Sequence, residues 1–181
     1  MDRSFNTSQH FTLSAGTCTL DVNRRKCLVV HCRKTGEFFL PKGRKDVSES
    51  LRSCALRETL EETGHHAYPL PLDVPTNATV GEVREAHLAD GNCEPVAVTQ
   101  RTIHNADGRQ TRKIIFWYAS QGDSTAEAVS NMKQEGEEDY EGVWVDCNDV
   151  SSTLTWDDDK GVADYVMNLA FNRSANATHG Q

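Results

Sequence analysis

The 181-residue sequence predicts an α/β fold: an α/β/α sandwich built on a mixed β-sheet. Two observations support this fold class. Apolar and polar residues alternate in several segments on both sides of one central helical segment, as expected for strands. A second segment with helical periodicity lies near the end of the chain. The sequence therefore predicts, in order, strands, a helix, more strands and a terminal helix.

The first half of the chain is predicted to contain three strands and one helix. The strands are expected at Phe11–Asp21, Lys26–Arg33 and Glu37–Leu40. Lys42–Glu49 is expected to be a loop, because the proline before it ends the third strand. The helix is expected from Leu51 to Glu62, with Ser48 or Ser50 as its N-cap and Gly64 at its end.

The second half is predicted to contain a hairpin, further strands and the last helix. Asp107-Gly108 is a hairpin signal between two alternating segments. The strands are expected at Thr79–Val83, Pro95–Ile103, Gln110–Ala119 and Gly142–Cys147, with a short helix at Asp149–Leu154. Thr155 is expected to cap a last helix that runs to about Asn172.

These elements fit one domain over residues 10–172. Residues 1–9 are polar and are expected to be flexible, and residues 173–181 are expected to be a disordered tail. Hydrophobic residues make up 37% of the chain and charged residues 25%, which is ordinary for a protein with a buried core. No apolar run approaches the ~20 residues that span a membrane.

Charge and cysteine content limit the partners and the compartment. The net charge of −8 argues against nucleic-acid binding by the whole surface. The segment from Arg24 to Lys45 is nevertheless strongly basic, which suits a ligand with many phosphates. The six cysteines show no zinc-site spacing, so reduced thiols and a cytoplasmic location are expected. A secreted protein whose signal peptide was removed is the alternative.

Three glutamates share one face of the predicted central helix. Glu58, Glu61 and Glu62 stand at positions i, i+3 and i+4. Like charges at these spacings destabilise a helix by roughly 0.2–0.5 kcal/mol per pair. A divalent cation with oxygen ligands would offset this repulsion, whereas a plain acidic face would be solvated.

A longer pattern surrounds these glutamates. Gly43, Glu49 and the run Arg57-Glu58-x-x-Glu61-Glu62-x-Gly64 fill every charged and glycine position of the signature of the Nudix hydrolases, which this sequence resembles. Thr59 and His65 stand where the family usually has aliphatic residues. The resemblance implies the Nudix fold, an α/β/α sandwich, with the signature forming a loop–helix–loop.

The resemblance also implies the chemistry, which is attack of water on a pyrophosphate bond. Mg²⁺ is the expected cofactor, with Mn²⁺ as the alternative, and the metal ligands would be Gly43 through its carbonyl, Glu58, Glu61 and Glu62. Arg57 is expected to orient the signature glutamates. A general base is expected from the later acidic run, at Glu138 or Glu141, or from Glu61 itself.

Basic residues before the signature and on a later strand are candidates for binding substrate phosphates. They are Arg33, Lys42, Arg44, Lys45, Arg112 and Lys113. The run Leu40–Lys45 resembles that of hydrolases of diphosphoinositol polyphosphates and diadenosine polyphosphates. A phosphate-rich small molecule, an inositol pyrophosphate or a dinucleoside polyphosphate, is therefore the expected substrate.

Three alternatives stay open. Removal of the messenger RNA cap would need aromatic residues for the cap base, for which Phe38, Phe39, Trp117 and Trp156 are candidates. Hydrolysis of sugar nucleotides is a second alternative. A Nudix-fold module that binds without catalysing is the third, although its glutamates would be expected to be degraded. The sequence does not indicate an oligomeric state.

Overall fold

The computed structural model describes residues 5–77, 91–105, 108–129 and 136–171. The strands are β1 (Phe11–Asp21), β2 (Lys26–Cys32), β3 (Glu37–Phe39), β4 (Lys42–Arg44), β5 (Tyr68–Pro69), β6 (Ala97–His104), β7 (Gln110–Gln121) and β8 (Tyr140–Asp146). The helices are α1 (Leu51–Thr63), α3 (Val150–Thr153) and α4 (Asp157–Phe171). None of the described helices is long and apolar enough to cross a membrane.

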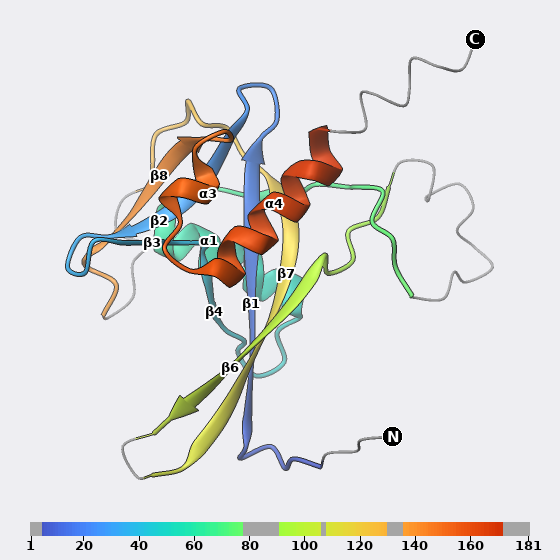
Figure 1. Ribbon diagram of the computed structural model, residues 1–181, viewed down its shortest axis with the longest axis vertical. Coiled ribbons are helices and arrows are strands. Elements are labelled where there is room, and N and C mark those ends of the chain that lie inside the picture. Colours follow the sequence, from blue (N-terminus) through green and yellow to red (C-terminus); the bar gives the residue numbers. More distant parts are fainter. Residues whose placement is uncertain (1–4, 78–90, 106–107, 130–135, 172–181) are drawn as a thin grey trace.

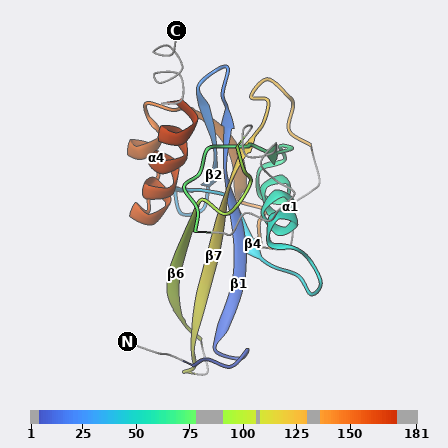
Figure 2. The ribbon, with the colours of Figure 1, turned by 90° about the vertical axis from the view of Figure 1, so that its right-hand side faces the viewer.

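The described strands form one mixed sheet between two helices. Its main path is β3-β2-β1-β7-β5, while β4 pairs with β1, β6 with β7 and β8 with β2. β1 and β7 run parallel at the centre, and the other pairs are antiparallel. Helices α1 and α4 cover opposite faces (Figures 1 and 2). The predicted α/β/α sandwich on a mixed sheet is therefore confirmed.

The strands β1, β6 and β7 extend well past both helices (Figure 1). β1 pairs with β7 from Phe11↔Arg112 to Leu20↔Gln121, and β6 pairs with β7 along its whole length. Both strands of the β6–β7 hairpin were expected from the sequence, within two residues at each end. Through this extension Ile103 of β6 and Lys113 of β7 line the candidate site together with residues of β4, with β1 between β4 and β7.

Helix α1 agrees closely with the sequence. The Ser50 hydroxyl accepts a hydrogen bond from the backbone N–H of Ser53, as an N-cap does. Gly64 ends the helix in a left-handed conformation, with φ of 74°. Cys54 and Ala55 pack against Ala15 of β1 and Tyr118 of β7. The helix is fixed on the sheet by these contacts and by Thr59, whose hydroxyl hydrogen-bonds that of Thr17 of β1 at 2.7 Å, and its second half also carries the glutamates.

The sequence indicated a loop at Lys42–Glu49, but the start of this segment is a strand. Lys42–Arg44 forms β4, antiparallel to β1, with Ala15 opposite Gly43 and Ser14 opposite Arg44. A strand of three residues has no alternation long enough to recognise, so only its pairing with β1 defines it. This short strand turns out to separate the two halves of the candidate site.

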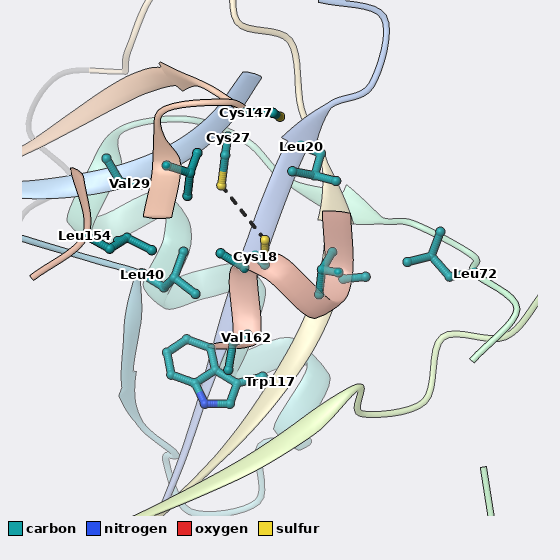
Figure 3. Packing of buried hydrophobic residues seen from close by; sticks show 14 of the residues in the cluster. Cys18, Leu20, Cys27, Val29, Leu40, Leu72, Trp117, Cys147, Leu154 and Val162 are labelled. Carbon is teal, nitrogen blue, oxygen red and sulfur yellow. Dashed lines mark hydrogen bonds between the residues drawn. The ribbon is translucent and has the colours of Figure 1, made fainter. Parts of the chain in front are cut away.

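The larger core lies between the sheet and α4. Figure 3 shows Trp117, Leu40 and Val162 packed together there, with Cys18 and Cys27 nearby. The sulfur atoms of these two cysteines are 3.9 Å apart, and all six cysteines are free thiols. Cysteines therefore serve in this core as small apolar side chains.

Two further expectations differ from the structure or lie outside it. Thr155 does not cap α4, which begins two residues later, because its hydroxyl accepts a hydrogen bond from the Phe38 N–H at 2.9 Å. The strand expected at Thr79–Val83 and the tail at residues 173–181 fall outside the described residues. The predicted strand after the acidic run is present, but it begins earlier, at Tyr140.

Candidate active site

The second half of α1 carries two buried carboxylates toward β4. The exposed fraction of Glu58 is 6% and that of Glu62 is 4%. Gly43 lies directly against Glu58: a Cβ atom at that position would be 1.8 Å from Glu58 Oε2. The Lys42 N–H donates to Glu62 Oε2 at 2.8 Å. Only glycine fits at position 43, because any side chain would displace the carboxylate.

Arg57 links the predicted glutamates into one network. Its guanidinium donates twice to the Glu49 carboxylate, at 2.9 and 3.0 Å, in a bidentate pair. One further nitrogen donates to Glu58 Oε1 at 2.8 Å and to Glu61 Oε2 at 2.7 Å. The hydrogen bonds from Arg57 hold the pKa of Glu49 below its usual value. Three carboxylates from two segments are thus fixed relative to one another.

Burial makes the inner carboxylates, those of Glu58 and Glu62, costly to ionise. It raises the pKa of Glu62 to about 8 and also raises the pKa of Glu58. Nearby carboxylates, including Glu137, add to the effect for both residues. A positive charge placed between these groups would reverse the penalty.

Glu137 completes a cluster with Glu58 and Glu62. One carboxylate oxygen from each of these three residues lies within 4.8 Å of the others. Oxygen donors of this kind suit a hard divalent cation, and the tight fit of Gly43 against Glu58 fixes one side of the group. The residues present therefore fit the divalent metal that the sequence implied. Glu61 instead directs a carboxylate oxygen to Arg57.

The structure brings Glu137, and not Glu138 or Glu141, to this cluster. The Glu138 carboxylate accepts hydrogen bonds from the Gly136 N–H, at 3.0 and 3.1 Å. Glu141 is exposed on β8, opposite His31. The run contains several acidic residues close together, and the sequence does not distinguish between them. The turn before β8 determines which glutamate faces α1. In that turn the Tyr140 N–H donates a hydrogen bond to the Glu137 carbonyl. No sequence motif predicts this contact.

Three of the six predicted phosphate-binding residues line one cleft next to the carboxylates. Lys42, Arg44 and Lys113 border a cleft of about 430 Å³, which Glu58 and Glu137 also line. A volume of this size is typical of small-molecule sites. The cleft is therefore lined by both carboxylate and basic side chains.

The other three predicted residues lie elsewhere. Lys45 donates to the carbonyl of Asp46, and Arg33 donates to the carbonyl of Glu138. Arg112 lines a separate hollow near the end of the β6–β7 hairpin. Arg112 and Lys113 face opposite sides of the sheet because side chains alternate along a strand. The sequence could not distinguish between these two neighbours.

The aromatic candidates do not line this cleft. Phe38 stacks on His31 with ring centroids 4.3 Å apart, and Phe39 packs edge-on against Tyr140. Trp117 is fully buried and donates to Thr99, while Trp156 is partly exposed next to α4. Among the described residues, the lining of the cleft includes no aromatic side chain.

Comparisons with known proteins bear on the domain as a whole and on its fold. A family model described as "NUDIX domain" matches residues 10–166. The fold resembles a NUDIX hydrolase from Nitrosomonas europaea, with a TM-score of 0.53 and 17% identity over 85% of this chain and 86% of that one. It also resembles a MutT NUDIX hydrolase from Burkholderia pseudomallei, with a TM-score of 0.55 and 16% identity over 87% and 98% of the two chains.

Two further proteins carry more specific names. The E. coli dihydroneopterin triphosphate pyrophosphohydrolase has a TM-score of 0.55 and 13% identity, over 90% of this chain and 99% of that one. A curated relative, "mRNA-decapping enzyme subunit 2" of Arabidopsis thaliana, is 41% identical over 49 residues. That match covers 27% of this chain and only 13% of the length of the relative.

Proposed function

The chain belongs to the Nudix family. From this premise we propose that it is a hydrolase of phosphorus-containing acid anhydrides, and we propose its cofactor, its site residues and its substrate. The proposed cofactor is Mg²⁺, with Mn²⁺ as the alternative. The proposed substrate is a diphosphoinositol polyphosphate or a dinucleoside polyphosphate. The reaction is attack of water on phosphorus within a pyrophosphate linkage.

The observation that carries this proposal is the group of Glu58, Glu62 and Glu137. Two of these carboxylates are buried, and all three lie within 4.8 Å of one another, beside a glycine that admits no side chain. These residues would hold the ion, together with Glu61 and the Gly43 carbonyl from the sequence expectation. When bound, a divalent ion neutralises phosphate charge and lowers the pKa of the attacking water.

The remaining residues have positioning and proton-transfer roles in this proposal. Arg57 keeps Glu49, Glu58 and Glu61 in one arrangement, so it is a positioning residue rather than a contact to substrate. Glu137 is less buried than Glu58 and Glu62 and borders the cleft. It is therefore the proposed acceptor of the proton of the attacking water, with Glu61 as the alternative.

Substrate choice rests on the cations of the cleft. Lys42, Arg44 and Lys113 suit several phosphates, and the described lining offers no aromatic ring on which a base could stack. These features favour a phosphate-rich small molecule over capped RNA. The curated relative named for decapping keeps RNA decapping as the second candidate, and sugar-nucleotide hydrolysis is the third.

The test compares turnover across substrate classes. The protein is incubated with Mg²⁺ and diphosphoinositol polyphosphates, diadenosine polyphosphates, capped RNA and ADP-ribose. Glu61→Gln and Glu62→Gln variants run in parallel, with Glu127→Gln, an exposed glutamate, as the control. Cleavage of the first two classes, lost in both site variants but not in the control, supports the proposal.

Each contrary result removes a different part of the proposal. Absence of turnover on every substrate would leave a binding module. Activity that survives both substitutions would exclude the proposed ligands. Cleavage of capped RNA alone would replace the proposed substrate with the second candidate.

A further inference from the structure

One buried hydroxyl in the cleft has no role in the chemistry above. Ser14 of β1 is fully buried and lines the cleft, and its Oγ has no hydrogen-bond partner. Buried polar groups nearly always have partners, because leaving one unpaired costs free energy. By contrast Ser120, a buried serine of β7, bonds to Thr19 at 2.6 Å. Nothing in the sequence distinguishes these two serines.

Strand alternation places Ser14 on the basic side of β4. Gly43 faces Glu58 of α1, so its neighbours Lys42 and Arg44 point to the opposite face. Ser14 pairs with Arg44, and the next residue of β1, Ala15, packs against α1. Ser14 therefore lies on the same face of the sheet as Arg44, opposite to the face that α1 covers, although Glu58 and Glu137 line the same cleft. Lys113 pairs with Thr12 and lines the same cleft.

Among the described residues, the cations on this face form no direct ion pair, although Glu62 lies near enough to attract Lys42 and Lys113. Within the described part of the chain, the ion pairs near the site go to Arg57 and Arg101, and none involves Lys42, Arg44 or Lys113. Burial lowers the pKa of Lys113, and the charges of Lys42 and Arg44 lower it further, while the Glu62 carboxylate acts in the opposite direction. Three like charges around one cleft repel one another, so an anion between them would be stabilised.

From this arrangement we propose that Ser14, Arg44 and Lys113 form a subsite for a substrate phosphate that is not cleaved. The subsite and the carboxylates Glu58 and Glu137 border different parts of the same cleft, so one substrate would place different phosphates at the two. The enzyme then selects substrates by their number of phosphates and not by their base. This inference rests on the proposed function and narrows it to substrates with at least one phosphate beyond the cleaved linkage.

The hydroxyl would act as a donor to a phosphate oxygen. Ser14 Oγ is closed to solvent in the structure, so contact requires small movements of the surrounding side chains. The long stems of Arg44 and Lys113, which border the same cleft, allow such movement. The serine would orient the phosphate, and the two cations would supply most of the attraction.

The test separates phosphate number from base identity. KM and kcat are measured in Mg²⁺ for ADP-ribose, diadenosine tri-, tetra- and pentaphosphate, and diguanosine tetraphosphate. For the wild type, we expect KM to fall with phosphate number and to differ by less than about threefold between the two tetraphosphates, because bases are not read. A larger effect of the base than of phosphate number would overturn the inference.

Substitutions then locate the subsite. Ser14→Ala and Lys113→Met are expected to raise KM for the pentaphosphate about tenfold and to raise the KM of ADP-ribose by much less, because a charge-assisted hydrogen bond to the additional phosphate is lost. Ser120→Ala and Lys160→Met are the matched controls and should leave every KM unchanged. Equal losses on ADP-ribose would show a general structural role and overturn the inference.

Folding and binding are read separately. Ser14→Ala should not lower Tm, because its hydroxyl has no partner, whereas Ser120→Ala should lower it. Calorimetric titration of wild type and Ser14→Ala with inorganic pyrophosphate and tripolyphosphate measures the subsite without turnover. Weaker tripolyphosphate binding by the variant, with pyrophosphate unchanged, supports the subsite even if no substrate is cleaved. Identical binding by both proteins would reject the subsite even if the enzyme is active.

Discussion

The two faces of β4 differ in how firmly their charged side chains are held. On the α1 face, Arg57 binds Glu49, Glu58 and Glu61 through hydrogen bonds of 2.7 to 3.0 Å. On the other face, Lys42, Arg44 and Lys113 form no direct ion pair among the described residues, although Glu62 attracts Lys42 and Lys113. The acidic side is therefore arranged by the protein itself, whereas no direct ion pair holds the cations of the basic side, so an anionic ligand would stabilise them. Substitutions on the acidic side should affect chemistry, and those on the basic side should affect selectivity.

The largest effect is expected from removing an inner carboxylate. Glu62→Gln should lower kcat/KM by at least about 100-fold, because a metal ligand is lost from a preorganised site. Its Tm without metal should stay the same or rise, because burial already raises the pKa of Glu62 to about 8. Steady-state kinetics and melting curves check both expectations. An active variant, or one that melts lower without metal, would contradict this account of the acidic side.

A smaller loss is expected from filling the space beside Glu58. Gly43→Ala would place a Cβ atom 1.8 Å from Glu58 Oε2, so β4 or the carboxylate must move. Activity should fall by about 10- to 100-fold, as for residues that support a metal ligand. The matched control is Gly161→Ala on α4, where a Cβ meets nothing within 4 Å. Helix propensity should make that control about 0.5–1 kcal/mol more stable, with full activity.

Arg57→Lys tests whether the acidic side needs geometry or only charge. Lysine keeps the positive charge but cannot form the bidentate pair with Glu49. The Mg²⁺ concentration for half-maximal activity should rise about 10- to 100-fold, while kcat at saturating metal falls less. A metal dependence unchanged by the substitution would mean that charge alone suffices. The pair at Glu49 would then be only a stabilising contact.

Much of the acidic side could be predicted from the sequence, since its residues lie within a few helical turns. Glu58, Glu61, Glu62 and Arg57 have fixed relative positions once a helix is assumed, and Ser50 and Gly64 mark its ends. The capped helix formed as expected because its contacts are local. The fold class could be predicted for the same reason, since alternation and periodicity are local properties of the chain.

The basic side could be predicted only in part, since it depends on strand pairing. Whether Arg112 or Lys113 faces the cleft follows from the register of β7 with β1, and the exclusion of Lys45 follows from the end of β4. A shift of one residue would exchange these side chains between faces. Ser14 could not be singled out, because its lack of a partner is a property of the packed structure.

Glu137 belongs to the acidic side but was missed for the same reason as the basic side. Glu137→Gln should lower kcat about tenfold or more, because a proton acceptor in the cleft is removed. Glu138→Gln is the matched control, since its carboxylate accepts from the Gly136 N–H instead of joining the cluster. If kcat falls in Glu138→Gln but not in Glu137→Gln, the proton acceptor is Glu138, which the sequence favoured.

The smallest expected effect is on stability, and it depends on pH. The pKa of Glu62 is about 8 in the folded protein without metal, against an ordinary value of 4.5. The folded state then binds more protons than the unfolded state between these values, so the metal-free protein loses stability as pH rises toward 8. Mg²⁺ should offset this loss, and its effect on Tm should be larger at pH 8 than at pH 6, where protons compete with the ion. A difference of about 2–4 °C would correspond to about 1 kcal/mol for a chain of this size. Glu62→Gln should remove most of the difference, whereas Ser14→Ala should retain it, because the serine lies on the other face of β4. Equal shifts at both pH values would mean that the buried carboxylates of the acidic side do not hold the ion.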